Sequence, residues 1–157
     1  MDDAKREYHL EVFADYYQFH IQEPGAAGES MTDWTAADVA VMAKVDFSVV
    51  ALCPVRNMTV PVHLEIRDTE PVYDLEGVDH AIRCSLDLPS GELQVSEAWG
   101  TEYLRLRLPG GTYGLLALYC GLGTLSEDGL DGDDSYRVIL WPSSPCPLTV
   151  LKQWTES

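Results

Sequence analysis

The sequence predicts a mostly β domain, an antiparallel two-sheet sandwich of about nine strands with one short helix. Apolar and polar residues alternate with a period of two in segment after segment, which is the pattern of half-buried strands. The long helical segments that a parallel α/β sheet needs as crossovers are missing. A chain of 157 residues fits one domain, so we expect residues 1–157 to share a single core.

The N-terminal third combines strands with the predicted helix. Residues 8–14 and 17–21 predict one long strand or two short ones. Thr35 can accept a hydrogen bond from the N–H of Asp38 while Asp38 reaches back, which is a capping box at a helix start. Residues 45–52 then return to a strand. Helical spacing predicts an apolar helix face made of Val39, Met42 and Ala43.

The middle of the chain alternates most clearly in residues 60–67. Pro61 cannot donate a backbone hydrogen bond, so this strand is expected at a sheet edge, or Pro61 among its first residues. Residues 82–88, 93–95 and 104–108 continue the pattern between turn residues and predict a meander of neighbouring strands.

The C-terminal part predicts three more strands. Residues 113–119 are almost continuously apolar, which places them at the centre of a sheet covered on both faces. Residues 136–141 and 148–151 form shorter strands, and the prolines between them should prevent the first from extending.

Charge limits the partners of the chain. It has 26 acidic and 10 basic residues and a formal net charge of -16. A phosphate backbone or an anionic membrane meets repulsion, so neither nucleic acid nor a membrane is expected as a direct partner. The same field attracts a basic protein and speeds its association. The alternative is that the charge serves solubility alone.

The N-terminal residues predict a cytoplasmic protein. They read MDDAKREYHLEV, without the apolar segment of a signal peptide, and the longest apolar stretch, residues 36–52, is interrupted by charged residues. The cysteines are widely spaced and lack metal-ligand spacing, so we expect four reduced thiols: Cys53, Cys84, Cys120 and Cys146.

Catalytic, cofactor and metal motifs are absent from the sequence. The nucleophile string G-x-S-x-G does not occur, and the glycine pair at residues 121–123 lacks the lysine and helix of a phosphate-binding loop. His63 beside Glu65 is the best pair for acid–base chemistry. We expect no enzyme activity, no cofactor and no metal. Solvated histidine side chains are expected at His9, His20, His63 and His80.

The most unusual segment is residues 126–135, with five carboxylates between two apolar strands. An EF-hand calcium loop starting at Glu127 fails, because Gly129 and Val138 fall where ligands are needed. The segment is either a solvated loop held open by its own charge or a loop that presents carboxylates to lysines and arginines of a partner. The carboxylates belong to Glu127, Asp128, Asp131, Asp133 and Asp134.

Two aromatic segments are further candidates for a binding surface. Trp34 either staples the helix to the core or, with Asp33, anchors an interface. Tyr16, Gln18 and His20 share one strand face, which is a recognition stripe or a solvated face.

Several short motifs occur in the order and spacing of a known family. They are Tyr17-Gln18-Phe19, Asp33-Trp34-Thr35, Arg56-Asn57, and Leu108-Pro109 with Gly111, Tyr113 and Leu115, before an acidic loop that leads into Tyr136. From Tyr8 to Trp141 the sequence resembles the competence protein J family, which inhibits the bacterial DNA-entry nuclease. The resemblance implies a compact β-rich protein that binds a metal-dependent nuclease and blocks its DNA site. The proline-rich C-terminal stretch departs from the family pattern.

Charge and resemblance lead to one hypothesis. We expect an inhibitor or immunity-like protein whose loop carboxylates, with Asp33 and Trp34 as outside candidates, occupy the basic groove where a nuclease holds phosphates. Two alternatives stay open. One is a carbohydrate or small-ligand module that uses the aromatic residues Trp99, Tyr103 or Tyr119. The other is an enzyme in which distant histidine and carboxylate side chains meet.

Overall fold

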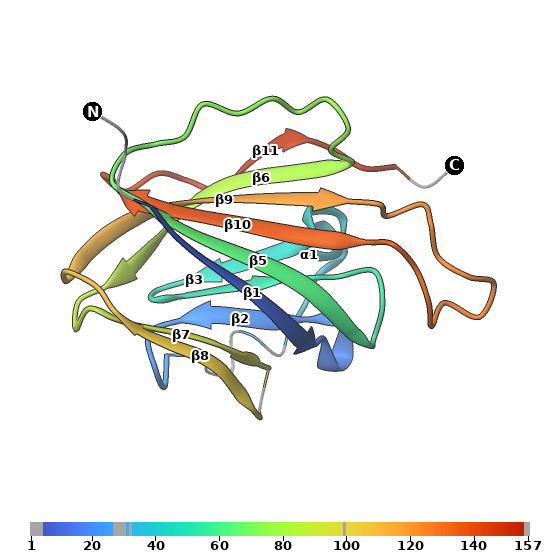
Figure 1. Cartoon of the computed structure of the whole chain (residues 1–157), viewed down its shortest axis with the longest axis horizontal. Coiled ribbons are helices and arrows are strands. Elements are labelled where there is room, and N and C mark those ends of the chain that lie inside the picture. Colours follow the sequence, from blue (N-terminus) through green and yellow to red (C-terminus); the bar gives the residue numbers. More distant parts are fainter. Residues whose placement is uncertain (1–4, 27–30, 32, 99, 156–157) are drawn as a thin grey trace.

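The computed structural model shows two β-sheets packed face to face (Figure 1) and describes residues 5–26, 31, 33–98 and 100–155. The predicted mostly β sandwich is confirmed, with eleven strands in the described residues instead of about nine. One sheet has the order β1-β5-β10-β9-β6-β11 and the other the order β3-β4-β2-β7-β8. A short 3-10 turn, η1 (Asp15–Tyr17), and one helix, α1 (Ala36–Val41), join strands in the N-terminal third.

The strand bounds follow the alternation of the sequence closely. The six-stranded sheet contains β1 (Lys5–Phe13), β5 (Thr59–Arg67), β6 (His80–Leu88), β9 (Gly111–Cys120), β10 (Ser135–Pro142) and β11 (Thr149–Lys152). The five-stranded sheet contains β2 (Phe19–Gln22), β3 (Ala43–Asp46), β4 (Val49–Leu52), β7 (Glu92–Glu97) and β8 (Glu102–Arg107).

The core lies between the two sheets. Strand β9 pairs with β10 on one side and β6 on the other, so the predicted central strand is confirmed. Its inner residues Leu115, Ala117 and Tyr119 are buried against the other sheet. Its outer residues Leu116 and Leu118 are also buried, in a second apolar cluster with Val78, Ala81, Ile139 and Trp141. The apolar run from Tyr113 to Tyr119 is therefore covered on both faces, as a central strand requires.

Strand β5 lies inside its sheet, so the edge position considered for it is wrong. It pairs with β1 antiparallel and with β10 parallel. The pairing with β10 begins at Val62. Pro61 lies before this point, so its missing backbone N–H removes no hydrogen bond to β10. Pro61 is thus tolerated as one of the first residues of the strand, which was the other possibility.

The predicted meander is also wrong, because β6 and β7 belong to different sheets. Strand β6 pairs with β9, while β7 forms a hairpin with β8. The turn between β6 and β7 is tight: the N–H of Gly91 donates to the carbonyl of Leu88 at 3.0 Å, and Gly91 has φ of +79°. Such a left-handed turn residue lets the chain leave one sheet and enter the other.

The region around the helix differs from the prediction in two ways. The capping box of Thr35 and Asp38 is present, but Val39 is 55% exposed and Met42 ends the helix in a left-handed conformation, so the predicted apolar face does not form. The strand expected at residues 45–52 is a hairpin of β3 and β4, because Ser48 takes a positive φ of 60°.

The stripe of Tyr16, Gln18 and His20 does not exist as one face. Tyr16 and Tyr17 have positive φ in η1, which separates β1 from β2 and places these strands in different sheets. Tyr16 is 71% exposed, whereas Gln18 and His20 are buried. Within the described residues no helix has the length and apolar character needed to cross a bilayer.

Candidate protein-interaction site

The connection between β9 and β10, residues 121–134, projects beyond the sheets at one end of the molecule (Figure 1). Four of the five predicted site carboxylates are exposed in it: Glu127, Asp128, Asp131 and Asp133. Among the described residues, none of these four makes an ion pair with a lysine, arginine or histidine. The loop therefore carries a local excess of negative charge.

Internal hydrogen bonds give this acidic loop a defined shape. The hydroxyl of Ser126 donates to the Asp128 carboxylate at 2.6 Å and accepts from the N–H of Asp131 at 3.0 Å. The N–H of Asp133 donates to Thr124 Oγ1 at 2.8 Å. Hydrogen bonds from the Ser126 hydroxyl and the Leu130 N–H lower the pKa of Asp128. These bonds favour the charged carboxylate and hold the loop in one conformation.

The fifth carboxylate, Asp134, is not a surface group, and its predicted role at an interface is corrected here. It is 1% exposed, and its Oδ1 accepts from Arg56 Nε at 2.7 Å. Its other oxygen accepts from the Tyr136 hydroxyl at 2.7 Å. Arg56 also donates to the carbonyl of Leu130 at 3.0 Å. A buried ion pair thus attaches the acidic loop to the body of the sandwich.

Six cations of the described residues pair with carboxylates away from the acidic loop. Arg67 and Arg137 both bind Glu65, Lys44 binds Asp38, and Arg83 binds Glu70. Arg105 and Arg107 bind carboxylates of the β7–β8 hairpin, Glu92 and Glu102. These pairs leave the carboxylates of the acidic loop uncompensated.

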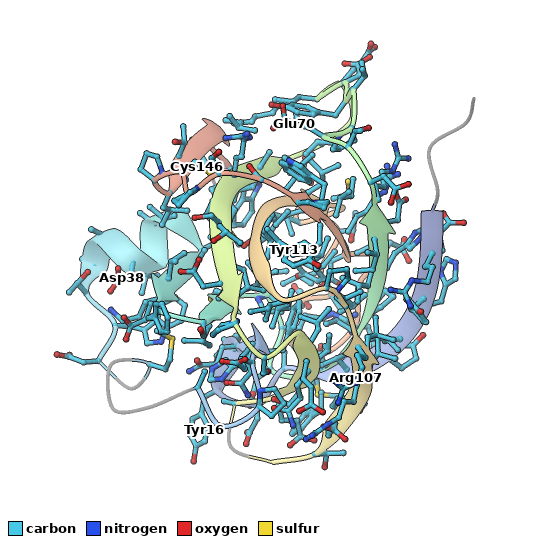
Figure 2. All side chains as sticks on the ribbon, turned by 90° about the vertical axis from the view of Figure 1, so that its left-hand side faces the viewer. Tyr16, Asp38, Glu70, Arg107, Tyr113 and Cys146 are labelled. Carbon is cyan, nitrogen blue, oxygen red and sulfur yellow. The ribbon has the colours of Figure 1, made fainter. Side chains whose placement is uncertain are left out.

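A second acidic segment joins β5 to β6 and was missed by the sequence analysis. Residues 68–79 contain five carboxylates in twelve positions, a density that should have been noticed. The segment arcs past β6 and β11 (Figure 1), its Val78 packs in the apolar cluster on the outer face of the six-stranded sheet, and Figure 2 shows Glu70 on the side of the molecule opposite Tyr16. Asp79 accepts from the N–H of Leu122 at 2.8 Å, which links this segment to the acidic loop.

Asp33 and Trp34 lie just before α1, and Trp34 packs on the five-stranded sheet. Trp34 is half-buried against Met31, Val49 and Ala51, and its Nε1 donates to the carbonyl of Met31 at 3.1 Å. This packing corresponds to the first of the two predicted roles of Trp34, in which it attaches the start of the helix to the core. Asp33 is exposed.

Two of the histidines predicted to be solvated are buried. His20 contacts Gln18 Oε1 through Nε2 at 2.9 Å, and burial lowers its pKa to about 4. His80 Nδ1 accepts from the N–H of Trp154 at 3.0 Å, and its Nε2 lies 2.6 Å from the carbonyl of Val41. Burial lowers the pKa of His80, although the carbonyl opposes this shift. Both imidazoles are structural groups of the core.

His63 and Glu65 lie on one strand face as expected, but the arrangement does not suit acid–base chemistry. Burial opposes ionisation of Glu65, yet the guanidiniums of Arg137 and Arg67 outweigh it and hold the pKa of this carboxyl below its usual range. His63 Nε2 lies 3.7 Å from Glu65 and 3.3 Å from Glu7. These three residues are near enough to share a metal ion, but the arginines already occupy both Glu65 oxygens, so the fit is poor.

The aromatic residues considered for a small ligand do not form a platform. Tyr119 is buried and its hydroxyl donates to the carbonyl of Met42 at 2.6 Å. Tyr103 is half-buried and donates to Glu97 at 2.8 Å. Trp99 lies outside the described residues. The four cysteines are free, as predicted, and burial raises the pKa of Cys84 to about 12 and that of Cys53 to about 11.

The fold and site define a two-sheet β-sandwich with an exposed, uncompensated acidic loop, and solved structures share this fold. ComJ from Bacillus subtilis, described as an inhibitor of the DNA-degrading activity of NucA, matches with a TM-score of 0.66 and 14% identity, over 91% of this chain and 100% of that chain. The product of crocagin biosynthetic gene J matches with a TM-score of 0.56 and 18% identity, over 92% of this chain and 100% of that chain. The fold implied by the resemblance is thereby confirmed. No family model and no curated protein sequence matches.

Proposed function

We propose that the protein inhibits a nuclease by binding its basic DNA groove through the acidic loop. The exposed carboxylates of Glu127, Asp128, Asp131 and Asp133, uncompensated by cations of the described residues, carry this proposal. Spaced carboxylates on a shaped loop can take the places that DNA phosphates occupy on a cationic groove. The fold shared with ComJ, an inhibitor of a DNA-degrading enzyme, supports the same function.

The buried pair of Arg56 and Asp134 supports the proposal through preorganisation. A loop that is ordered before binding loses less conformational entropy on association. Arg56 reaches both the Asp134 carboxylate and the Leu130 carbonyl, so it restrains the loop from inside. A specific interface buries about 1,600 Å² in total, so further surface beside the loop must take part.

The test measures DNA degradation by a basic DNA-entry-type nuclease at rising concentrations of this protein. A triple variant, Glu127→Gln, Asp131→Asn and Asp133→Asn, removes three exposed charges whose side chains make no hydrogen bond among the described residues. We expect slower association, a flatter dependence on salt and at least about tenfold weaker inhibition.

A second triple variant distinguishes the effect of the acidic loop from the effect of a lower net negative charge. Glu23→Gln, Glu92→Gln and Glu102→Gln remove the same number of charges from the side of the five-stranded sheet, and each Gln keeps an oxygen that can accept from the Ser90 N–H, Arg107 or Arg105, which these residues bond. It should inhibit almost as well as the unchanged protein. Equal losses in both triple variants would exclude the loop as the contact, and absence of inhibition by the unchanged protein would exclude the function itself.

A further inference from the structure

A pocket of about 550 Å³ lies between the second acidic segment and the outer face of the six-stranded sheet. Asp74, Glu76 and Val78 form one wall, from the connection of β5 to β6. Strands β1, β5, β9 and β10 supply the rest, including His9, Glu11, His63, Leu118, Ser135 and Arg137. Ser135 directly follows the acidic loop, so the pocket borders the proposed interaction site.

The charges that line the pocket favour a cation. Glu11, Asp74 and Glu76 are exposed and make no ion pair with a cation of the described residues. Arg137, which also lines the pocket, shares buried Glu65 with Arg67, and both guanidiniums bond to it at 3.0 Å, so these three residues keep one net positive charge. The three exposed carboxylates outnumber that charge and give the pocket a net negative potential.

The other lining groups select a long side chain with a planar charged end. Val78 and Leu118 belong to the apolar cluster on the outer face of the sheet and offer a surface for a hydrocarbon stem. The rings of His9 and His63 lie with centroids 4.2 Å apart, tilted by 37°. Flat rings beside carboxylates match a guanidinium, which stacks on planar groups and donates in a fork to carboxylates.

We propose that this pocket receives an arginine side chain of the protein partner. The identity of that partner as a nuclease rests on the proposed function, whereas the chemistry of the pocket does not. The same connection exposes Val72 completely and Tyr73 partly, which provides apolar contact area for a protein around the inserted arginine. The pocket supplies part of the additional interface that the acidic loop alone lacks.

The test uses N-acetylarginine amide as probe and follows backbone amide signals of the whole chain by NMR. N-acetylcitrulline amide, an uncharged isostere, is the control. We expect saturable shifts at Val78, Leu118 and Arg137 with the arginine probe, and at least about tenfold weaker binding of the citrulline probe. Equal binding of both probes, or no saturable shift at these residues, would overturn the proposal.

Two double variants locate the effect. Asp74→Asn with Glu76→Gln should weaken arginine binding several-fold, because it removes two negative charges from the pocket. The asparagine at position 74 keeps an oxygen that can accept from the residue 76 N–H, so the local backbone should keep its shape. Glu127→Gln with Asp131→Asn removes two charges from the acidic loop and should change it little. Equal weakening by both pairs would mean diffuse attraction and contradict a pocket.

The same variants distinguish this inference from the proposed function. If the arginine probe binds in the pocket but no basic nuclease is inhibited, the pocket stands and the nuclease function fails. If a nuclease is inhibited equally well by the Asp74/Glu76 variant and the probe does not bind, the function stands and the pocket assignment fails.

Discussion

At the scale of single residues, Asp134 and Asp133 show how burial separates neighbouring carboxylates of one loop. Asp133 is exposed, while Asp134 is buried between Arg56 and Tyr136. A buried charge without its partner is costly, so Asp134 contributes to the stability of the fold and Asp133 to the charge of the surface.

Replacing Asp134 by Asn should therefore destabilise the protein strongly. The change leaves the Arg56 guanidinium buried without a counterion, and we expect a loss of about 3 kcal/mol in the free energy of unfolding. Urea denaturation followed by circular dichroism measures it. The neighbouring Asp133→Asn should shift the free energy by less than about 0.5 kcal/mol. Equal, small effects of both changes would contradict the structural role of Asp134.

A second residue-scale prediction concerns pH and His20. Burial lowers its pKa from the ordinary 6.5 to about 4 in the folded protein, so the unfolded chain binds more protons between these values. Stability from neutral His20 is complete above pH 6.5 and falls as pH decreases toward 4. By pH 5 this one group should cost about 2 kcal/mol.

The check compares urea denaturation of the unchanged protein and His20→Gln at pH 7 and pH 5. The variant should lose less stability on acidification than the unchanged protein. An NMR titration of the unchanged protein provides an independent reading, and a His20 pKa near 6.5 would refute the argument.

At the scale of elements, the acidic loop is a short structure with its own hydrogen bonds. Ser126 links its two halves, because its hydroxyl contacts Asp128 and Asp131 while its N–H donates to the carbonyl of Asp131 at 2.8 Å. The connection resembles a compact surface loop whose shape depends on its own side chains.

Ser126→Ala should loosen this loop without unfolding the sandwich. We expect faster hydrogen exchange at the Asp131 amide and several-fold weaker inhibition of the nuclease. The inhibition weakens because the loop then loses conformational entropy when it binds. Ser143→Ala, which removes an exposed hydroxyl on another connection, is the control and should change neither reading. Unchanged exchange at Asp131 would show that the hydroxyl does not order the loop.

At the scale of the whole molecule, the net charge of -16 acts on stability as well as on partners. Like charges repel in the compact state, and the cations are largely used in local pairs. The two acidic segments meet where Asp79 binds the N–H of Leu122, so repulsion is concentrated at this end.

Salt should therefore stabilise the free protein. Raising NaCl from about 0.01 M to about 0.15 M shortens the screening length from about 30 Å to about 8 Å, and the urea midpoint should rise. The rise should be smaller for the triple variant of Glu127, Asp131 and Asp133. KCl should act like NaCl, because screening depends on ionic strength. A midpoint independent of salt would show that the acidic segments cost the fold little.

The sequence alone determined the class of the fold and several strands of it. Alternation of period two is a local property, so residues 60–67, 82–88 and 113–119 predict strands whatever their neighbours are. Net charge and the density of carboxylates in residues 126–135 are also readable without coordinates. The capping box at Thr35 was predictable because it involves residues three positions apart.

Only the tertiary structure decided which strands pair and which carboxylates are exposed at the surface. The parallel contact of β5 with β10 and the separation of β6 from β7 depend on residues far apart in the chain, to which a local pattern is insensitive. Asp134 is identical in type to Asp131, and its burial follows from Arg56, 78 positions away. The pocket beside Asp74 and Glu76 likewise exists because a connecting segment folds over a sheet, so it depends on packing between residues far apart in the sequence.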